Sequence, residues 1–488
     1  MTNLSNEKTN PKKNSQISNC ATNHKNKEQQ ALALFKKGNS KKAEEIYRNL
    51  ILICTKNYII YNNFAVICGS KGRWLESIEL LYKALRLSPN DPDIYKNLGV
   101  ACWEFGDLNG ASTFHKTSIK LRPDNPDPYN NLGLNLQASG NLKAAIVAFN
   151  TSLKLNPNNS KTQTNLAIAL LTVGDYKKGW EKYEWRHTKN KEQSTFHAQP
   201  NCPKWDGLTL NSQTPLLLVS EQGLGDTMQF MRYALHLRNQ GIAVSICAQP
   251  SLHRLIQLSG IDLNPLSPQE ANAINKGIWM PLLSLPNYLE VSHNNPIITK
   301  PYIKTSDELN AKWKYLLSVE QTPIIGINWQ GNPEQEKNLS QGRSLPLETF
   351  APITAQASIK LASLQKGIGS EQLENCSFRD RFVSCQAQIN SSWDFIETAA
   401  IINNCDLIIT SDTSIAHLAA AMGKPTWTLL SRTPDWRWGL AGDTTFWYPS
   451  MRLFRQKNQG NWEEVMKRVV KKLQDTFKNG KQTLNSPN

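Results

Sequence analysis

One spacing constrains this chain more than any other feature: a pattern of aromatic, small and breaking residues recurs every 34 positions. Three successive blocks each begin with a tyrosine, and these are Tyr61, Tyr95 and Tyr129. Within the blocks, glycines and a closing proline keep the same offsets, as Gly106 and Pro123 do in the second. The frame continues backward to about residue 24 and forward to about residue 190, which makes five units. A repeat of this length predicts stacked helix pairs that bury their apolar faces against one another.

The residues inside each unit fit two helices that cross closely. Gly99 and Gly133 are small where the helices would touch, and Gly106 lies where the chain must turn between them. The pattern resembles the tetratricopeptide repeat (TPR), and this resemblance implies an α-solenoid with a concave groove over residues 24–190. Two uses of the array remain open, which are binding in the groove and scaffolding or dimerisation. His115 occupies the place of a packing aromatic, so we expect it in the core.

One short motif in the array invites a metal interpretation. Asp91-Pro92-Asp93 matches the Asp-x-Asp pattern that holds a divalent cation in many glycosyltransferases. Its position between two repeats instead favours an ordinary turn and helix cap. The nine cysteines contain no Cys-x-x-Cys pair, so neither a zinc site nor a disulfide framework is expected.

Charge and hydropathy limit the partners. The net charge is +15, and +9 of it falls within residues 27–190. A solvated helical surface explains this excess best, although an acidic acceptor or a peripheral membrane contact stays open. No basic–aromatic interleaving typical of nucleic-acid binding is present. Residues 1–23 lack an apolar core and are expected to be a disordered leader, and without a signal or a long apolar run we expect a cytoplasmic protein.

The C-terminal part alternates strands with helices after a polar linker at 191–213. The expected strands are 215–220, 242–247, 324–329, 359–364, 406–410 and, as the last, 426–430. This order predicts two Rossmann-like α/β halves at 214–310 and 311–478, followed by a tail at 479–488. Ligands of such halves bind at the carboxyl ends of the parallel strands.

A glycine turn follows the first of these strands. Gly223-x-Gly225-Asp226 lacks the third glycine of a dinucleotide fingerprint and the lysine of a P-loop. Asp226 is therefore the residue of this turn that indicates a function. A carboxylate in the first turn of a helix suits a general base, because the helix start keeps it ionised. A purely structural helix cap is an equally good interpretation of Asp226 alone. Glu221 is the nearest rival as a base.

A second turn follows the strand expected at 406–410. Ser411, Asp412, Thr413 and Ser414 open a helix whose exposed N–H groups would attract an anion. The hydroxyls of Thr413 and Ser414 would add donors to a diphosphate, whereas Asp412 is expected to act as a cap. His417 lies one turn further, either steadying the phosphate or packing as a core histidine.

Six motifs occur in an order that resembles a known family. They read Ser-Glu-Gln-Gly-Leu-Gly-Asp-Thr (220–227), Asn-Trp-Gln-Gly-Asn-Pro (328–333), Arg-Ser-Leu-Pro (343–346), Ser-Leu-Gln-Lys-Gly (363–367), Ser-Asp-Thr-Ser-Ile-Ala-His (411–417) and Pro-Asp-Trp-Arg-Trp (434–438). Together they are similar to bacterial TPR glycosyltransferases with a heptosyltransferase-like catalytic domain. The resemblance implies a GT-B fold, inversion at the anomeric carbon and no metal or other cofactor.

The resemblance also implies roles for individual residues. Asp226 would be the base in the acceptor half, and Asp412, Thr413 and His417 would serve the nucleotide sugar in the other half. A basic residue that touches phosphate is expected to be Arg343, with Lys337 in reserve. Two alternatives remain open, a non-catalytic scaffold that binds a nucleotide sugar and a protein O-glycosyltransferase. The acceptor, protein or glycan, would dock through the TPR groove.

The aromatic run near the end of the chain has two interpretations. Trp436, Arg437 and Trp438 would either stack on a base or sugar, or form a buried cluster under a loop.

Overall fold

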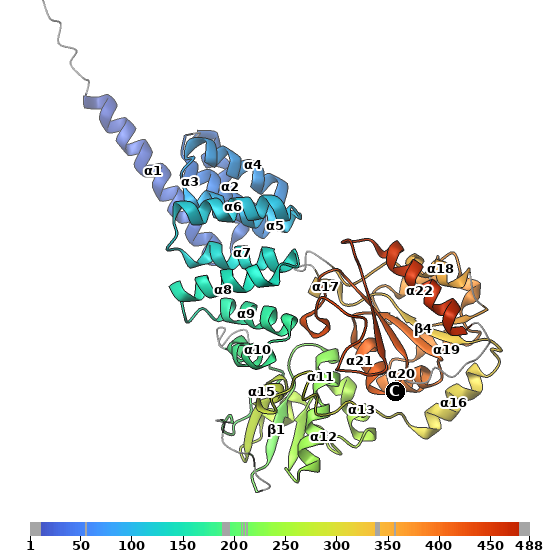
Figure 1. Ribbon diagram of the computed structural model, residues 1–488. Coiled ribbons are helices and arrows are strands. Elements are labelled where there is room, and N and C mark those ends of the chain that lie inside the picture. Colours follow the sequence, from blue (N-terminus) through green and yellow to red (C-terminus); the bar gives the residue numbers. More distant parts are fainter. Residues whose placement is uncertain are drawn as a thin grey trace, which may run out of the picture. The chain divides into compact units, whose positions relative to one another are not determined.

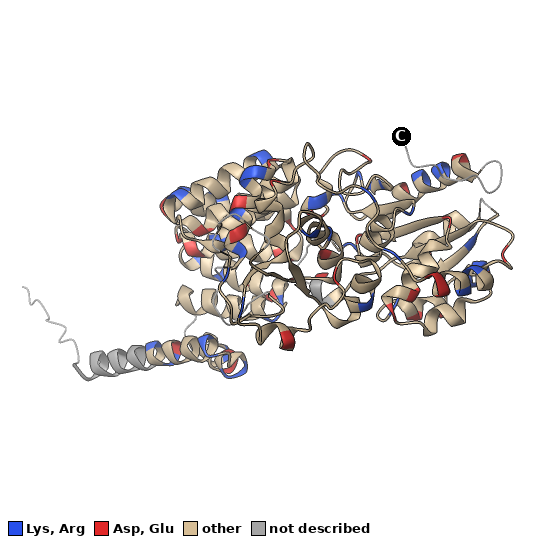
Figure 2. Ribbon diagram, turned by 90° about the horizontal axis from the view of Figure 1, so that it is seen from below, with Lys and Arg blue, Asp and Glu red and all other residues tan. Residues whose placement is uncertain are grey.

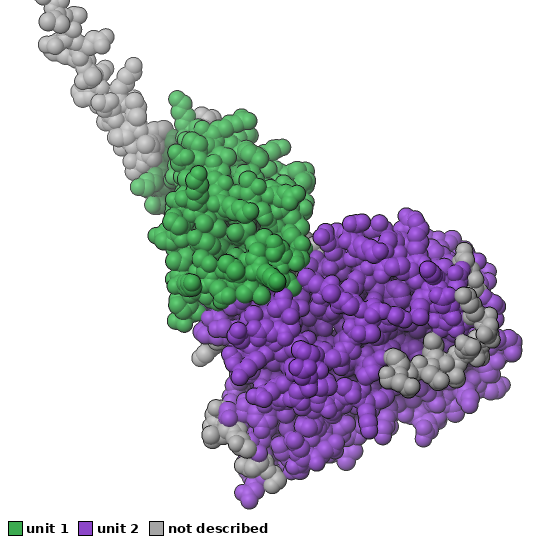
Figure 3. All heavy atoms as spheres, in the orientation of Figure 1, with its two compact units in different colours: residues 1–158 green, residues 159–488 purple. Residues whose placement is uncertain are grey.

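The computed structural model describes residues 11–53, 56–187, 196–205, 207, 210, 213–336, 342–355 and 358–477. These residues belong to two compact units, Met1–Asn158 and Asn159–Asn488 (Figure 3). The described part of the first unit is helical throughout. The second unit contains one more helix pair and two parallel β-sheets (Figure 1).

The helices of the array form antiparallel pairs that follow the 34-residue period. In the first unit they are α1 (Pro11–Lys36), α2 (Ser40–Ile53), α3 (Tyr58–Ser70), α4 (Trp74–Leu87), α5 (Pro92–Phe105), α6 (Leu108–Leu121), α7 (Pro126–Ala138) and α8 (Leu142–Leu155). Positive φ angles recur at the turns within the pairs, at Gly38, Gly72, Gly106, Gly140 and Gly174. Glycine adopts these angles without the penalty that a Cβ atom imposes. The predicted repeat and its turns are therefore confirmed.

The prediction that Asp91-Pro92-Asp93 is a cap is also confirmed. Asp91 accepts hydrogen bonds from the backbone N–H groups of Asp93 and Ile94, at 2.8 and 3.3 Å, and Pro92 begins α5. Asp93 forms ion pairs with Lys96 and Arg122, both at 3.0 Å. Both carboxylates thus serve the repeat. Within the described residues, no group of three His, Cys, Asp or Glu side chains is arranged to hold a metal ion.

His115 lies in the core of the array, as expected. Its side chain is buried, and a Cβ atom on Gly99 would lie 2.3 Å from the His115 ring. Gly99 is therefore required by the close packing of α5 on α6. Burial lowers the pKa of His115 to about 4, so the ring is neutral at physiological pH.

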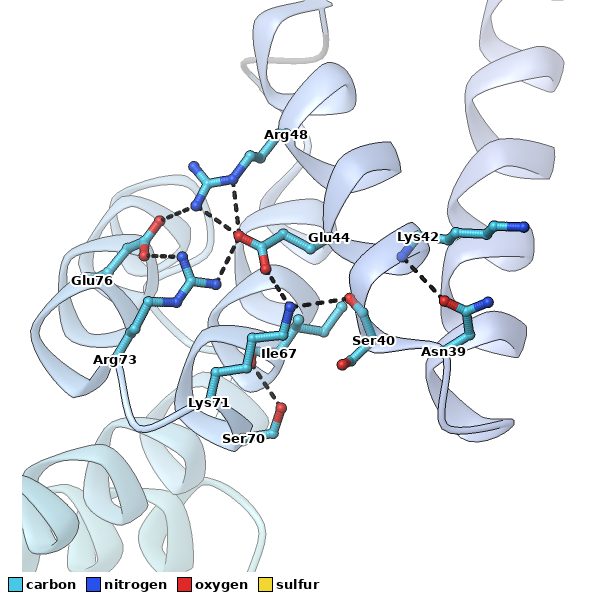
Figure 4. A network of polar contacts seen from close by, with 10 residues as sticks. All are labelled: Asn39, Ser40, Lys42, Glu44, Arg48, Ile67, Ser70, Lys71, Arg73 and Glu76. Atoms are coloured by element: carbon cyan, nitrogen blue, oxygen red, sulfur yellow. Dashed lines mark hydrogen bonds and ion pairs between the residues drawn. The ribbon is translucent and has the colours of Figure 1, made fainter.

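A polar network joins the first two repeats (Figure 4). The Glu44 carboxylate of α2 forms ion pairs with Arg48, Lys71 and Arg73 at 2.6–2.7 Å. Arg48 and Arg73 also reach Glu76 of α4, at 3.1 and 2.7 Å. Burial would raise the pKa of Glu44, but the hydrogen bonds from Lys71, Arg48 and Arg73 outweigh it and lower the pKa to about 2. Basic and acidic segments are interspersed along the ribbon (Figure 2), and in this network the basic residues are paired.

The expected leader differs from the structure. Residues 1–10 lie outside the described residues, but 11–23 belong to α1, which runs without a break into the first repeat. The physical reason is the absence of glycine and proline between Pro11 and Gly38, so nothing in this stretch interrupts helical hydrogen bonding. No helix in the described part of the chain is long and apolar enough to cross a membrane.

The fifth repeat packs in the second unit. It consists of α9 (Ser160–Val173), α10 (Tyr176–Tyr183) and the short η1 (Glu184–His187). Trp180 and Tyr183 are buried in the same apolar cluster as residues of the α/β domain, among them Trp436 and Trp447. The boundary between compact units thus falls at 158, whereas the sequence placed the end of the array at 190.

The α/β domain has two parallel sheets. The first has the order β2-β1-β3 and the second the order β5-β4-β6-β7-β8. The strands are β1 (Leu216–Val219), β2 (Val244–Cys247), β3 (Ile278–Pro281), β4 (Ile324–Asn328), β5 (Lys360–Ser363), β6 (Leu407–Ser411), β7 (Thr426–Leu430) and β8 (Met451–Arg455). The connections are α11 (Leu224–Phe230), α12 (Arg232–Asn239), η3 (Pro250–Leu252), α13 (His253–Leu258), α14 (Pro268–Asn272), η4 (Leu282–Ser284), α15 (Leu285–Tyr288), α16 (Asp307–Leu317), α17 (Pro333–Glu336), η5 (Leu347–Phe350), α18 (Ala351–Thr354), η6 (Ser370–Glu374), η7 (Arg379–Arg381), α19 (Gln386–Ser391), α20 (Phe395–Asn403), α21 (Ser414–Ala421), η8 (Trp436–Trp438) and α22 (Trp462–Phe477).

Both faces of the larger sheet are covered. Ile325 and Ile327 of β4 pack in a cluster that includes residues of α18 and α22, whereas Ile324 packs in the cluster of α20 and α21. A parallel sheet covered on two faces explains why its strands are apolar runs without alternation. The expected pair of α/β halves is confirmed.

Three details differ from the sequence prediction. The last strand is β8, not 426–430. Its sequence Met-Arg-Leu-Phe-Arg mixes charged and apolar residues, so it was not recognised as a strand. The boundary at 310 falls inside α16, which begins after the cap Ser306 and packs on α20 through Asn310. The expected linker is partly ordered, since Phe196 bridges to Glu221 and Lys204 to Trp279.

Candidate active site

The glycine turn brings Asp226 to the carboxyl end of β1. β1 ends at Val219, and α11 begins after Gly223, so Asp226 lies in the first helical turn. Asp226 Oδ2 accepts a hydrogen bond from the Gly223 backbone N–H at 2.8 Å. Gly223, not Asp226, is the N-cap residue, and Asp226 caps the helix from its third position, with its side chain still 19% exposed. The cap uses one carboxylate oxygen only.

Gly225 allows the two halves to meet beside Asp226. A Cβ atom at Gly225 would lie 2.8 Å from His417 Cδ2 and 3.5 Å from Ser414 Cα, both on α21. The starts of α11 and α21 are thus in direct contact. These are the N-termini of two helices, one from each α/β half. Both carry partial positive charge and face the same region.

Arg437 from η8 completes the surroundings of Asp226. Its Nη2 donates to Asp226 Oδ1, Nε to Gln229 Oε1 at 2.5 Å, and Nη1 to Asp435 Oδ1 at 2.9 Å. Burial raises the pKa of Asp226 above its usual value, and the charge of Arg437 only partly offsets this. Removal from water therefore has a larger effect on this pKa than the surrounding positive charges.

The strand ends of the second half form a hydrogen-bonded network. Asn328 at the end of β4 donates to Gln365 Oε1 at 2.8 Å and accepts from the Thr413 hydroxyl at 2.8 Å. The Thr410 hydroxyl lies 3.2 Å from that of Thr413. The proton of Thr413 thus serves this network, which differs from the expected donation to a diphosphate.

The start of α21 has backbone N–H groups without a side-chain cap. Thr413, not Asp412, occupies the cap position, and its side chain makes no capping hydrogen bond. Ser414 is half-buried, while the buried Ser411 hydroxyl has no partner among the described residues. Burial and the nearby charge of Asp435 raise the pKa of Asp412 to about 6. At mildly acidic pH this carboxyl group is therefore mostly protonated and does not repel an anion.

His417 is a buried, neutral side chain. Its Nδ1 lies 3.0 Å from the Tyr448 hydroxyl, and its ring stacks on Trp438 at a centroid distance of 5.6 Å. Burial lowers its pKa well below the usual value, and Arg437, Arg232 and Arg343 act in the same direction. The core interpretation of His417 is therefore favoured over that of a charged phosphate ligand.

Arg343 lies in the same polar region. Its side chain is 33% exposed, and its ion pair within the described residues is a long one, 3.4 Å from Glu336. Its charge partly offsets the rise in the pKa of both Asp226 and Asp412 that burial causes. Lys337, the reserve candidate, lies outside the described residues.

Two predictions about neighbouring residues are resolved. Glu221, the rival base, is fully buried and pairs with Arg186 of the fifth repeat through two hydrogen bonds at 2.8 and 3.0 Å. It has no access to an acceptor. Trp436 and Trp438 are buried, so the aromatic run is a cluster under a loop and not a stacking platform.

Sequence reasoning named Arg437 only as part of the aromatic run, and Asn328 and Gln365 only within motifs. It missed the contacts that these residues make in the site. Arg437 lies 211 positions from Asp226, and local pattern does not reveal such a pairing. A signal was present nonetheless. An arginine flanked by two tryptophans in a buried run requires an acidic partner, because buried arginines are almost always paired.

A cavity of about 460 Å³ opens beside the end of β5. Its lining includes Gln365, Lys366, Gln386 and Trp393. Trp393 is 71% exposed, and burial lowers the pKa of Lys366 to about 8. Gln365 also belongs to the strand-end network, so Gln365 and Asn328 connect the cavity to Thr413 through hydrogen bonds.

Comparison with known families supplies the class of this domain. Residues 357–472 match the family model for glycosyltransferase family 9 (heptosyltransferase). The chain carries a glycosyltransferase domain. Residues 65–106 match a TPR model and residues 126–159 a tetratricopeptide repeat model. The resemblance stated from the motifs is confirmed. The glycosyltransferase match includes Thr413 and Arg437, whereas Asp226 and Arg343 lie before it.

A curated protein is similar to part of this chain. Protein FlbA of Caulobacter vibrioides is 24% identical over 328 residues, which are 62% of this chain and 53% of FlbA. This chain thus spans about half the length of this relative.

Two solved structures are similar to parts of this chain. MamA from Desulfovibrio magneticus is 16% identical and covers 34% of this chain and 97% of its own, with a TM-score of 0.31. The pilF protein of Pseudomonas aeruginosa is 16% identical and covers 48% and 90%, with a TM-score of 0.35. Similarity at this level carries no argument about activity.

Proposed function

We propose that the chain transfers a sugar from a nucleotide-sugar donor to an acceptor hydroxyl with inversion, and that Asp226 is the general base. The observation that carries this is the position of Asp226, at the carboxyl end of β1 and in contact range of the start of α21. In paired Rossmann-like halves, ligands bind at these strand ends. The glycosyltransferase class of the second half supplies the reaction type.

The geometry of the carboxylate suits a base. Gly223 and Arg437 each occupy one oxygen of Asp226, and each oxygen retains a lone pair. The raised pKa makes this carboxylate a better proton acceptor than an exposed aspartate. In the proposed step the acceptor oxygen attacks the anomeric carbon, its proton passes to Asp226, and the nucleotide diphosphate leaves from the opposite face.

We place the donor in the second half. The cavity near β5 has an exposed indole, Trp393, against which a nucleobase would stack. The uncapped N–H groups of α21 and the guanidinium of Arg343 would receive the diphosphate. This positive charge replaces a metal, so we expect activity to survive excess EDTA. A loss of turnover that Mg²⁺ or Mn²⁺ restores would overturn the metal-free proposal.

The acceptor is proposed to reach the site with help of the TPR array, as a protein or a glycan. A screen of the full chain against UDP-, ADP- and GDP-sugars, with release of the nucleotide as readout, identifies the donor. The absence of turnover with every donor that binds would favour a non-catalytic sugar-nucleotide scaffold instead.

The decisive variant is Asp226→Asn. The amide oxygen can still accept from Gly223, while the amide NH2 group replaces the oxygen that accepts from Arg437. We expect the variant to fold and to bind donor, and kcat to fall by at least ~10²-fold. Asp443→Asn is a matched control, because Asp443 is 59% exposed and pairs with Arg452. Wild-type kcat in Asp226→Asn would remove Asp226 from the role of base.

A further inference from the structure

The fifth repeat holds the loop that carries Asp226. We call residues 220–226 the base loop. Arg186, at the end of the fifth repeat, is 6% exposed and donates from Nε and Nη2 to the two oxygens of Glu221, at 3.0 and 2.8 Å. Glu221 is fully buried. A bidentate pair of this kind fixes the direction of the loop as well as its position.

The remaining donors of Arg186 are also used. They go to the Tyr183 carbonyl at 3.0 Å, to Glu184 Oε1 at 3.1 Å and to the Ser284 hydroxyl at 3.1 Å. The guanidinium also lies over the Tyr183 ring, 4.4 Å from its centroid. Arg186 is therefore itself held in one orientation, which is what a residue that positions another requires.

The next residue of the base loop is held by the same repeat. Gln222 has a φ of +61°, an angle that non-glycine residues rarely adopt. Its side-chain amide donates to the Tyr183 hydroxyl at 2.9 Å. An unfavourable backbone angle persists only where the surroundings hold it, and here Tyr183 and Arg186 flank it.

The fifth repeat also supports the partner of Asp226. The Trp436 ring packs edge-on against Trp180, at a centroid distance of 5.3 Å, and lies 6.2 Å from Tyr183. Trp436 directly precedes Arg437, which donates to Asp226. Trp180 is anchored in turn by its indole N–H, which donates to the Val291 carbonyl at 2.8 Å.

We propose that the fifth repeat is a structural part of the active site, with Arg186 and Tyr183 as positioning residues for the base Asp226. The inference rests on the proposed function, since it needs Asp226 to be the base. Two chains of contacts support it, one through Glu221 and Gln222 and one through Trp436 and Arg437. A displacement of the last repeat would therefore change the direction of the base.

Stability alone explains the Arg186–Glu221 pair poorly. Replacing a buried ion pair by apolar side chains of similar volume is often neutral for stability, whereas removal of one partner is costly. The double variant Arg186→Met/Glu221→Met therefore separates the two roles. It approximately keeps the volume and leaves no fully buried charge unpaired, because Glu184, which also loses its contact with Arg186, is 33% exposed. It removes the directional hydrogen bonds to the loop.

The test compares this double variant and Tyr183→Phe with the wild-type full chain. We expect melting temperatures within a few degrees of wild type, donor KM within about twofold and kcat lowered at least tenfold in the double variant. For Tyr183→Phe we expect a smaller fall in kcat of about threefold. Arg122→Met is the control, because Arg122 is an arginine of the array that pairs with Asp93 away from the base loop.

Three results would overturn the inference. One is a double variant with wild-type kcat, and another is a fall in kcat that merely follows a fall in melting temperature. The third is a rise in donor KM that equals the fall in kcat. If the double variant does not fold, Arg186→Lys replaces it in the test. Lysine keeps the positive charge but cannot donate two hydrogen bonds to Glu221. A wild-type kcat in Arg186→Lys would also overturn the inference. A fully active Asp226→Asn variant would instead show that Asp226 is not the general base, which would refute the proposed function.

Discussion

At the scale of single residues, the properties of Asp226 arise from opposing effects. Burial disfavours its charged form, while Arg437 and the Gly223 N–H favour it. Other titratable groups near Asp226 are Asp435 and Arg343, and His197 and His417 face the same region. Arg437 makes the shortest contact among them, so it should have the largest influence on when Asp226 titrates.

This predicts the pH dependence of an Arg437→Gln variant. A base is active when deprotonated, and loss of the arginine charge raises the pKa of Asp226 further. The acidic limb of kcat/KM should therefore move to higher pH, with the largest loss of rate below neutrality. Rate profiles between pH 5 and 9 measure this, with Arg452→Gln as a control because Arg452 pairs with the exposed Asp443. A loss of equal size at every pH would show that Arg437 does not set the titration of Asp226.

How much of the site the sequence predicts depends on the distance between its residues along the chain. Asp226 and the start of α21 were found because a strand, a turn and a helix follow one another directly. The pairing of Asp226 with Arg437, and of Glu221 with Arg186, depends on tertiary packing that no local pattern encodes. The same packing favours the core interpretation of His417 and uses the Thr413 hydroxyl in an internal hydrogen bond.

At the scale of elements, the repeat frame was predicted almost completely. The glycines at the turns and the caps such as Asp91 act through the backbone of their own neighbourhood, so the sequence reveals them. β8 was missed because its arginines interrupt the apolar run that marks a buried strand, and α16 because its first half is polar. Elements at the edge of a domain have only one apolar face and leave a weaker signal.

The contacts of Glu44 between α2, α3 and α4 predict a pH-dependent stability. The pKa of Glu44 is lowered in the folded state to about 2, below its usual 4.5. Its stabilisation is therefore present above pH 4.5 and is lost as the pH falls toward 2. We expect Glu44→Gln to lower the free energy of unfolding by about 1 kcal/mol at pH 7 and by almost nothing near pH 2.

Chemical denaturation followed by circular dichroism, at several pH values, measures this difference. The control is Glu79→Gln, which replaces an exposed carboxylate on α4 and should leave stability unchanged. Equal stabilities of Glu44→Gln and wild type at pH 7 would mean that desolvation cancels the ion pairs.

At the scale of the whole molecule, the compact units divide the chain inside the repeat array. Repeats that contact only their neighbours usually fold as a series, so an array can be cut between units. In this chain the fifth repeat shares an apolar cluster with the α/β domain, including Trp180, Tyr183, Trp436 and Trp447. Sequence periodicity counts repeats, but it does not show which core each one completes.

The division predicts different behaviour for two fragments. Residues 24–158 should be helical and unfold cooperatively, because their four helix pairs lie in one compact unit. Residues 24–187 should contain the same cooperative core, but their fifth repeat would expose Trp180 and Tyr183 to water and leave the buried Arg186 without Glu221. Hydrogen exchange should therefore show protected amides in α3–α8 of both fragments and little protection in α10 of the longer one. Protection of α10 equal to that in the full chain would mean that the fifth repeat folds without the glycosyltransferase domain, and its contacts with the base loop would then join two independently stable parts.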